Sequence, residues 1–167
     1  MLMLSMFLSA CRGDPTTMTQ LPLNSSDLPS TLVRICQVLI ENPSVDTLAS
    51  RLGKHQQDEL NGPGFRTVTS APPEFEKLLV YFLSSQDQVT LKAQFKPGQG
   101  ITVGALKDKF GPFRILPQDP GNFRRGQIAF EKVIGSHTCE LNLYLEQLKE
   151  KVEDTDRVSE LSILVWE

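Results

Sequence analysis

Two of the three cysteines stand where the sequence pattern predicts a buried face. Cys36 shares one helical face with Leu32 and Leu39, and Cys139 alternates with polar residues in step with Leu141. Both thiols are expected to point into the core, because apolar residues at helical or strand spacing mark the buried side. The pattern is consistent with a disulfide between Cys36 and Cys139, and equally with two independent buried thiols.

His137 lies two residues before Cys139, and side chains two apart on a strand point to the same face. Such a pair can begin a metal site, which needs three or four ligands. The only other histidine is His55, in a distant segment, and no further cluster of Cys and His completes the set. We therefore expect His137 at the edge of the core and no bound metal.

The glycines of the segment 98–104 follow an expected strand and precede an expected helix, an order that nucleotide-binding turns share. The expected helix is short, however, and the chain beyond it has the pattern of antiparallel strands rather than of a βαβ unit. We interpret Gly98, Gly100 and Gly104 as residues of an ordinary turn, and we expect no nucleotide or other cofactor.

Catalytic groups are hard to assemble from this composition. Nucleophilic catalysis needs a base beside a Ser, Thr or Cys, and the chain has two histidines and no nucleophile-elbow motif. None of the 20 acidic residues stands in an apolar setting that would raise its pKa, and most lie in solvated runs such as KEKVEDTD. We expect a protein that is not an enzyme; a small periplasmic hydrolase is the less favoured alternative.

The loop over residues 113–126 is the candidate for contacts with another protein. It combines Arg114, Phe123, Arg124 and Arg125 with stiffening Pro and Gly residues. Arginine and aromatic side chains dominate the energetic hot spots of protein interfaces, and a stiff loop loses little entropy on binding. The alternative is a long hairpin connection whose Phe123 folds back on the core.

The third cysteine ends a short apolar run, since Leu8, Ser9 and Ala10 precede Cys11. This stretch resembles the lipobox of bacterial lipoproteins. The resemblance implies cleavage after Ala10, lipidation of Cys11 (a diacylglyceryl group on sulfur and a fatty acid such as palmitate), and attachment to a membrane. Residues 1–10 would then be a signal peptide, since an apolar run this short cannot span a bilayer. The alternative is an accidental match in an apolar N-terminus.

The segment after Cys11 is rich in Pro, Ser and Thr and poor in large apolar residues, which predicts a flexible tether over 11–29. Residues 30–167 are long enough for one globular domain with a core of its own. In the lipoprotein family, Arg12 in place of Asp favours the outer membrane, so the resemblance implies the periplasmic face of that membrane. The net charge of −3 argues against nucleic acid as a partner.

Helices are expected over 30–41 and 45–52, as an N-terminal hairpin, and over 70–85 and 102–110. Strands are expected over 65–69, 88–96, 127–134, 137–146 and 159–167, with a surface loop over 54–65. The short links between the last strands favour an antiparallel meander. The predicted fold class is α+β, with the helical hairpin and further short helices packed on one face of an antiparallel sheet of about four to five strands.

The helix ending in Phe110 and Gly111, followed by a meander, is similar in rhythm to small lipoproteins that assist outer-membrane assembly and to β-lactamase-inhibitor-like domains. It also suits lipid-anchored immunity proteins that neutralise periplasmic toxins. These resemblances imply a non-catalytic, monomeric binding protein of the envelope. Its partner would be another protein, which is either an enzyme or toxin to be inhibited or an assembly complex to be joined.

Overall fold

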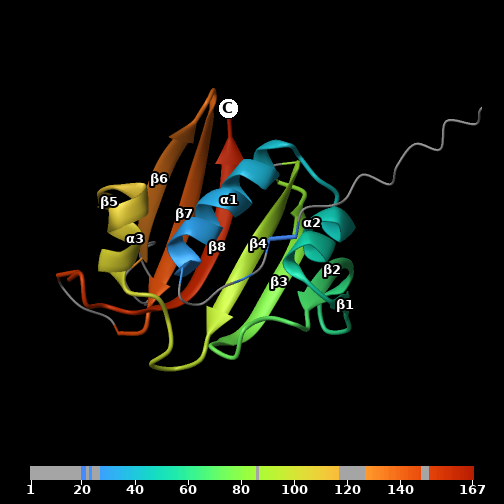
Figure 1. Cartoon of the computed structure of the whole chain (residues 1–167), viewed down its shortest axis with the longest axis horizontal. Helices are drawn as coiled ribbons and strands as arrows, with labels where there is room; N and C mark the ends of the chain where they lie inside the picture. Colours follow the sequence, from blue (N-terminus) through green and yellow to red (C-terminus); the bar gives the residue numbers. More distant parts are fainter. Residues whose placement is uncertain (1–19, 22, 24–26, 86, 117–126, 148–150) are drawn as a thin grey trace, which may run out of the picture.

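A sheet of eight antiparallel strands dominates the computed structural model, which describes residues 20–21, 23, 27–85, 87–116, 127–147 and 151–167 (Figure 1). The strands are β1 (His55–Asp58), β2 (Gly62–Val68), β3 (Phe75–Leu83), β4 (Gln88–Phe95), β5 (Phe113–Ile115), β6 (Gln127–Ile134), β7 (His137–Leu145) and β8 (Val158–Trp166). Their order across the sheet is β1-β2-β3-β4-β8-β7-β6-β5, so β8 joins two runs of sequential strands.

Three described helices lie on one face of this sheet: α1 (Leu28–Ile40), α2 (Val45–Leu52) and α3 (Val103–Phe110) (Figure 1). Side chains cap the backbone N–H groups at the starts of the two short helices. Ser44 accepts a hydrogen bond from the N–H of Thr47, and Thr102 accepts one from the N–H of Ala105. None of the described helices is long and apolar enough to cross a lipid bilayer.

The hydrophobic core fills the space between the helices and the sheet. Val89, Leu91, Ala93 and Phe95 of β4 alternate with polar residues and are all buried, as the spacing predicts. The expected helices at 30–41, 45–52 and 102–110 and the strands of the C-terminal meander are confirmed, with small shifts of their ends.

The predicted fold class is wrong in two respects. The sheet has eight strands rather than four to five, so more residues lie in strands than in helices. The two N-terminal helices do not form a packed hairpin: α1 lies against β8 and α3, whereas α2 lies against β2 and β3. Each helix buries its apolar stripe against a different part of a wide sheet, which offers more apolar area than the neighbouring helix does.

The helix predicted over 70–85 is also wrong, because this segment contains β3. Leu78, Leu79 and Val80 are buried in succession, which is the pattern of a strand that has neighbours on both sides and apolar contacts on both faces. Because apolar and polar residues do not alternate in such a run, its apolar positions also fitted the spacing of a helix. Pairing with β2 and β4 decides the outcome.

The segment 54–65, predicted as a surface loop, forms β1 and the start of β2 instead. Asp58 accepts a hydrogen bond from the backbone N–H of Asn61 at 2.8 Å, which closes the tight turn between the two strands. The polar composition that suggested a loop reflects the position of β1 at the edge of the sheet, where side chains meet water.

A disulfide joins Cys36 of α1 to Cys139 of β7, with their Cα atoms 5.8 Å apart. Of the two alternatives that the sequence leaves open, the structure has the disulfide. Both residues are fully buried. The bond ties the first helix to a central strand that lies 103 residues further along the chain.

Candidate binding surface

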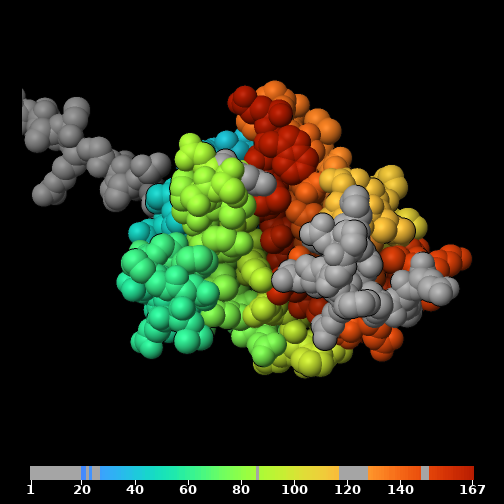
Figure 2. All heavy atoms as spheres, turned by 180° about the vertical axis from the view of Figure 1, so that it is seen from behind, coloured from blue at the N-terminus to red at the C-terminus, as the bar shows by residue number. Residues whose placement is uncertain are grey.

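One face of the sheet has no described helix over it, and strands lie side by side across it when the molecule is seen from behind (Figure 2). We call this the open face. Its side chains alternate with those of the core face, and strand pairing aligns them in rows. Over the central strands these residues are Leu79, Tyr81, Thr90, Lys92, Gln94, Glu140, Asn142, Tyr144, Glu160, Ser162 and Leu164.

Two β-bulges shape one end of the open face. The register of β3 against β4 shifts between Phe75 and Lys77, which leaves Glu76 as the extra residue. The register of β8 against β7 shifts in the same way, and the extra residue there is Ser159. A bulge re-aims the side chain that it carries, and bulges are frequent beside binding sites. Both re-aimed side chains line the same pocket.

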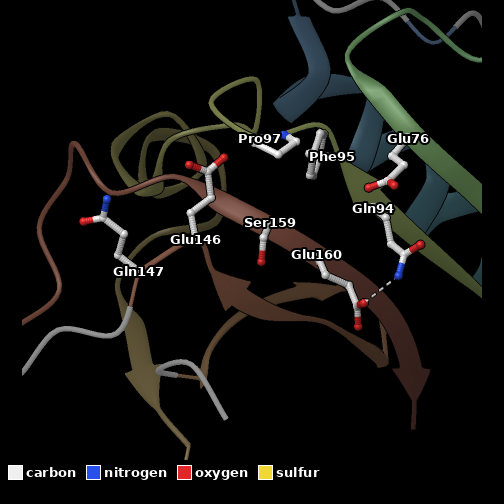
Figure 3. Close-up of a pocket in the computed structure, with 8 residues that line it drawn as sticks. All are labelled: Glu76, Gln94, Phe95, Pro97, Glu146, Gln147, Ser159 and Glu160. Atoms are coloured by element: carbon white, nitrogen blue, oxygen red, sulfur yellow. Dashed lines mark hydrogen bonds between the residues drawn. The ribbon is translucent and has the colours of Figure 1, made fainter.

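The pocket between these bulges has a volume of about 410 Å³ (Figure 3). Its lining residues come from β3, β4, β8 and the segments after β4 and β7: Glu76, Gln94, Phe95, Pro97, Glu146, Gln147, Ser159 and Glu160. Figure 3 shows Glu76 and Gln94 on one side, Glu146 and Gln147 on the other, and Ser159 between them. Among its described lining residues are three carboxylates and no cationic side chain, so these residues attract hydrogen-bond donors and positive charge.

A polar network holds the centre of the open face. Glu160 pairs with the Lys92 ammonium at 2.8 Å and accepts a hydrogen bond from the Gln94 amide at 3.1 Å. Tyr81 lies near both charged groups; burial raises the pKa of its hydroxyl, and the Glu160 charge adds to the rise while Lys92 opposes it. Tyr81 also stacks on Phe65 at a ring separation of 4.9 Å. The network fixes long side chains in place before any partner arrives.

Arg114 is the one predicted contact residue that the structure describes, and it belongs to a second network. Its guanidinium donates to Glu131 at 2.8 Å and also to Glu140, so it bridges β5, β6 and β7. The Glu140 carboxylate has only 8% of its side chain exposed, and it accepts a further hydrogen bond from Asn142. The hydrogen bond to Glu131 raises the pKa of Arg114 above its ordinary value. Half of the Arg114 side chain remains accessible to a partner.

A third network lies near the β1 edge. The Asp58 carboxylate is almost fully buried, pairs with Lys77 at 2.8 Å and accepts a hydrogen bond from the Thr67 hydroxyl at 2.6 Å. The Lys77 ammonium, helped by Thr67, holds the pKa of Asp58 well below its usual range. The charges of all three networks are therefore locked at fixed positions across the sheet.

Ser159 carries the one hydroxyl group among the described residues that line the pocket. The Ser159 hydroxyl donates to the carbonyl of Tyr144 at 3.1 Å, and neither His55 nor His137 lines the pocket. A serine nucleophile needs a base within hydrogen-bond reach, and none of the described lining residues is a histidine or a lysine. Cys139 is bonded to Cys36, so its sulfur is not available to a metal beside His137. No group of three or more metal-ligating side chains occurs among the described residues.

The glycines at 98–104 serve close packing. A Cβ on Gly100 would lie 1.7 Å from the carbonyl oxygen of Val158, and one on Gly104 would lie 3.0 Å from Asp154. Only glycine lets the segment before α3 approach the start of β8 so closely. The backbone N–H of Gly98 donates to Glu146 at 2.8 Å, which ties this turn to the rim of the pocket.

The residues predicted from sequence are only partly covered by the structure. Cys36 and Cys139 come together, and Arg114 joins the open face; Cys11, Phe123, Arg124 and Arg125 lie outside the described residues. The bulge residues Glu76 and Ser159 were missed, because a bulge follows from strand register and leaves no mark in a single sequence. No protein-family model, curated protein or solved structure matches this chain.

Proposed function

We propose that the protein is a lipid-anchored, non-catalytic binding protein of the bacterial envelope that contacts another protein through its open face. The observation that carries the proposal is the combination, on one accessible face, of stacked aromatic rings, pre-organised ion pairs and a pocket built by two bulges. Aromatic and arginine side chains in fixed positions are the groups that contribute most to protein interfaces.

The size of the open face supports a protein partner. The eight strands, of three to nine residues each, rise about 3.3 Å per residue and lie about 4.8 Å apart, so together they present roughly 900 Å². A stable protein complex buries about 800 Å² on each partner. A partner that covered this face would therefore meet the area that a specific interface needs, without rearrangement of the sheet.

The path of the chain also supports an anchor that leaves the open face accessible. Leu21 is buried, and its N–H donates to the carbonyl of Arg51 at 2.8 Å, at the end of α2. The chain thus enters the folded region on the helix-covered side. A tether from a lipidated Cys11 would attach there, and the open face would point away from that attachment.

Site-specific photocrosslinking in the native bacterium tests the contact surface. A photoreactive residue is placed at Ser162 or Val133, whose strand positions put them on the open face, and at Gln37, an exposed residue of α1, as the matched control. We expect one adduct of defined mass from the two sheet positions, at least fivefold above the control. Equal yields from Gln37, or none from the sheet, would contradict the proposal.

The identity of the adduct separates the two versions of this function. An immunity or inhibitor protein would capture a toxin or enzyme, and its co-expression would abolish the activity of that protein. An assembly accessory would capture a component of an outer-membrane complex and would copurify with it. The predicted outer-membrane, periplasm-facing location is common to both versions.

A further inference from the structure

A second cavity, of about 860 Å³, is lined by residues at the ends of α1 and β8. Figure 1 shows both elements ending towards the top of the view. Its floor and walls include Leu39 and Ile40 from the last turn of α1 and Val165 and Trp166 from the end of β8. Trp166 is the only tryptophan of the chain and keeps 39% of its surface exposed. By strand alternation the Trp166 side chain lies on the open face with Leu164, whereas Val165 lies on the helix side, so Leu39 and Val165 provide the apolar surface for a ligand.

The charge around this cavity has one sign. Asp87 and Glu167 line it, and no lysine or arginine is found among its described lining residues. His137 is the one lining group there that can become positive, and its Nε2 lies 3.7 Å from Glu167, so two carboxylates outnumber it in either protonation state. The C-terminal end of α1 adds the negative pole of a helix dipole, and α1 has no basic residue in its last turn.

We propose that this cavity binds an apolar organic cation, an alkylammonium group whose chain lies on Leu39 and Val165 and whose charge lies beside the carboxylates of Asp87 and Glu167. An ammonium group is attracted by a carboxylate, and the attraction grows when both are partly removed from water. A neutral alkyl chain would gain only the apolar contact, and an alkyl carboxylate would be repelled. The proposed function rests on the bulge pocket and the polar networks of the open face, and none of their described residues lines this cavity, so failure of this site leaves the proposed function intact.

Fluorescence of the full chain tests the proposal directly, because its single tryptophan lines the cavity. The probes are n-hexylammonium, n-hexanol and hexanoate at constant ionic strength. We expect a saturable change in Trp166 emission with n-hexylammonium, an apparent Kd at least fivefold weaker for n-hexanol, and no saturation with hexanoate. Equal responses to the amine and the alcohol would overturn the assignment of a cation site.

Substitutions locate the binding. Asp87→Asn preserves the backbone, since asparagine tolerates the positive φ of 52° at this position, and Glu167→Gln removes the second carboxylate. The double variant should weaken n-hexylammonium binding at least fivefold. Asp108→Asn, in a different pocket, is the control and should leave it unchanged. An unchanged affinity in the double variant would place the amine elsewhere and overturn the proposal.

The same assay separates the two natural sources of an alkylammonium group. A short peptide with one lysine is compared with the same peptide acetylated on that lysine. If the lysine peptide binds at least as tightly as n-hexylammonium and the acetylated one does not, the site receives a lysine of a protein. If only the free amine binds, the site receives a small molecule. Binding of neither would contradict the proposal.

Discussion

Individual charged residues on the open face are held by partners that come from distant parts of the sequence. Arg114 meets Glu140 across 26 residues, and Asp58 of β1 meets Lys77 of β3 across the intervening strand β2. The sequence indicated Arg114 as a functional residue because of its type and its loop, and it gave no sign of Glu140. Such a pairing depends on strand register, which a single sequence leaves open because a slip of one residue exchanges the two faces.

Arg114→Ala should lower the free energy of unfolding by about 1–3 kcal/mol, because a nearly buried carboxylate at Glu140 loses its main partner. Urea unfolding at neutral pH measures the loss. Adding Glu140→Gln to the variant removes the uncompensated charge and should recover part of the stability. A double variant that is as unstable as the two single losses combined would show that the pair is not coupled.

The Asp58 carboxylate makes the free energy of unfolding depend on pH in the acidic range. Its folded pKa lies below the ordinary value of 3.8, so the carboxylate contributes stability above about pH 4, and this contribution is lost as the pH falls further. Asp58→Asn should be less stable than the parent at pH 7, and the two curves should converge as the pH is lowered towards 2. The exposed neighbour Glu59 gives the control: Glu59→Gln should follow the parent at every pH.

At the scale of elements, the sequence predicted helices and strands well wherever one face is buried and the other is wet. The helix at 45–52 has a clear cap and stripe, and β4 alternates strictly. Prediction failed at β3, which is apolar on both faces, and at β1, which is polar because it lies at an edge. In both places the neighbouring strands, rather than local preference, determine the structure.

The disulfide between α1 and β7 should be a large part of the stability. Closing a loop of about 100 residues restricts the unfolded chain by up to about 4.7 kcal/mol in the chain-entropy model, and loss of such bonds commonly costs 2–5 kcal/mol. Cys36→Ala with Cys139→Ala should lower the unfolding free energy by about that amount in urea. The reductant-treated parent should match it, whereas a reductant should not affect the variant.

At the scale of the molecule, the proposed lipid anchor would lie on the helix-covered side of the sheet, and the proposed contact surface would lie on the opposite side. The proposed membrane attachment depends on Cys11, which lies outside the described residues. The side of the molecule on which the anchor would lie is inferred from the position of Leu21 beside α2. Neither the width of the sheet nor the choice of face could be predicted from the sequence, because both depend on pairing across the whole chain.

Intact mass of the protein from a bacterial membrane fraction tests the address. We expect the loss of residues 1–10 and a gain that matches a lipid group on Cys11. Cys11→Ser should remain uncleaved and unlipidated, and it should leave the membrane fraction. A full-length, unmodified mass in both samples would contradict the lipoprotein proposal, while the disulfide between Cys36 and Cys139 provides an internal check that the protein is folded.

The central place of β8 has a consequence for synthesis. This strand follows all the other described strands along the chain, yet it lies between β4 and β7. Until β8 has joined the sheet, β1–β4 and β5–β7 are two half-sheets, each with an unpaired inner edge that can pair with other chains. A nonsense mutation shortly before Val158 would therefore remove one strand and leave two half-sheets with unpaired edges. We expect such a truncated chain to aggregate rather than to retain partial activity.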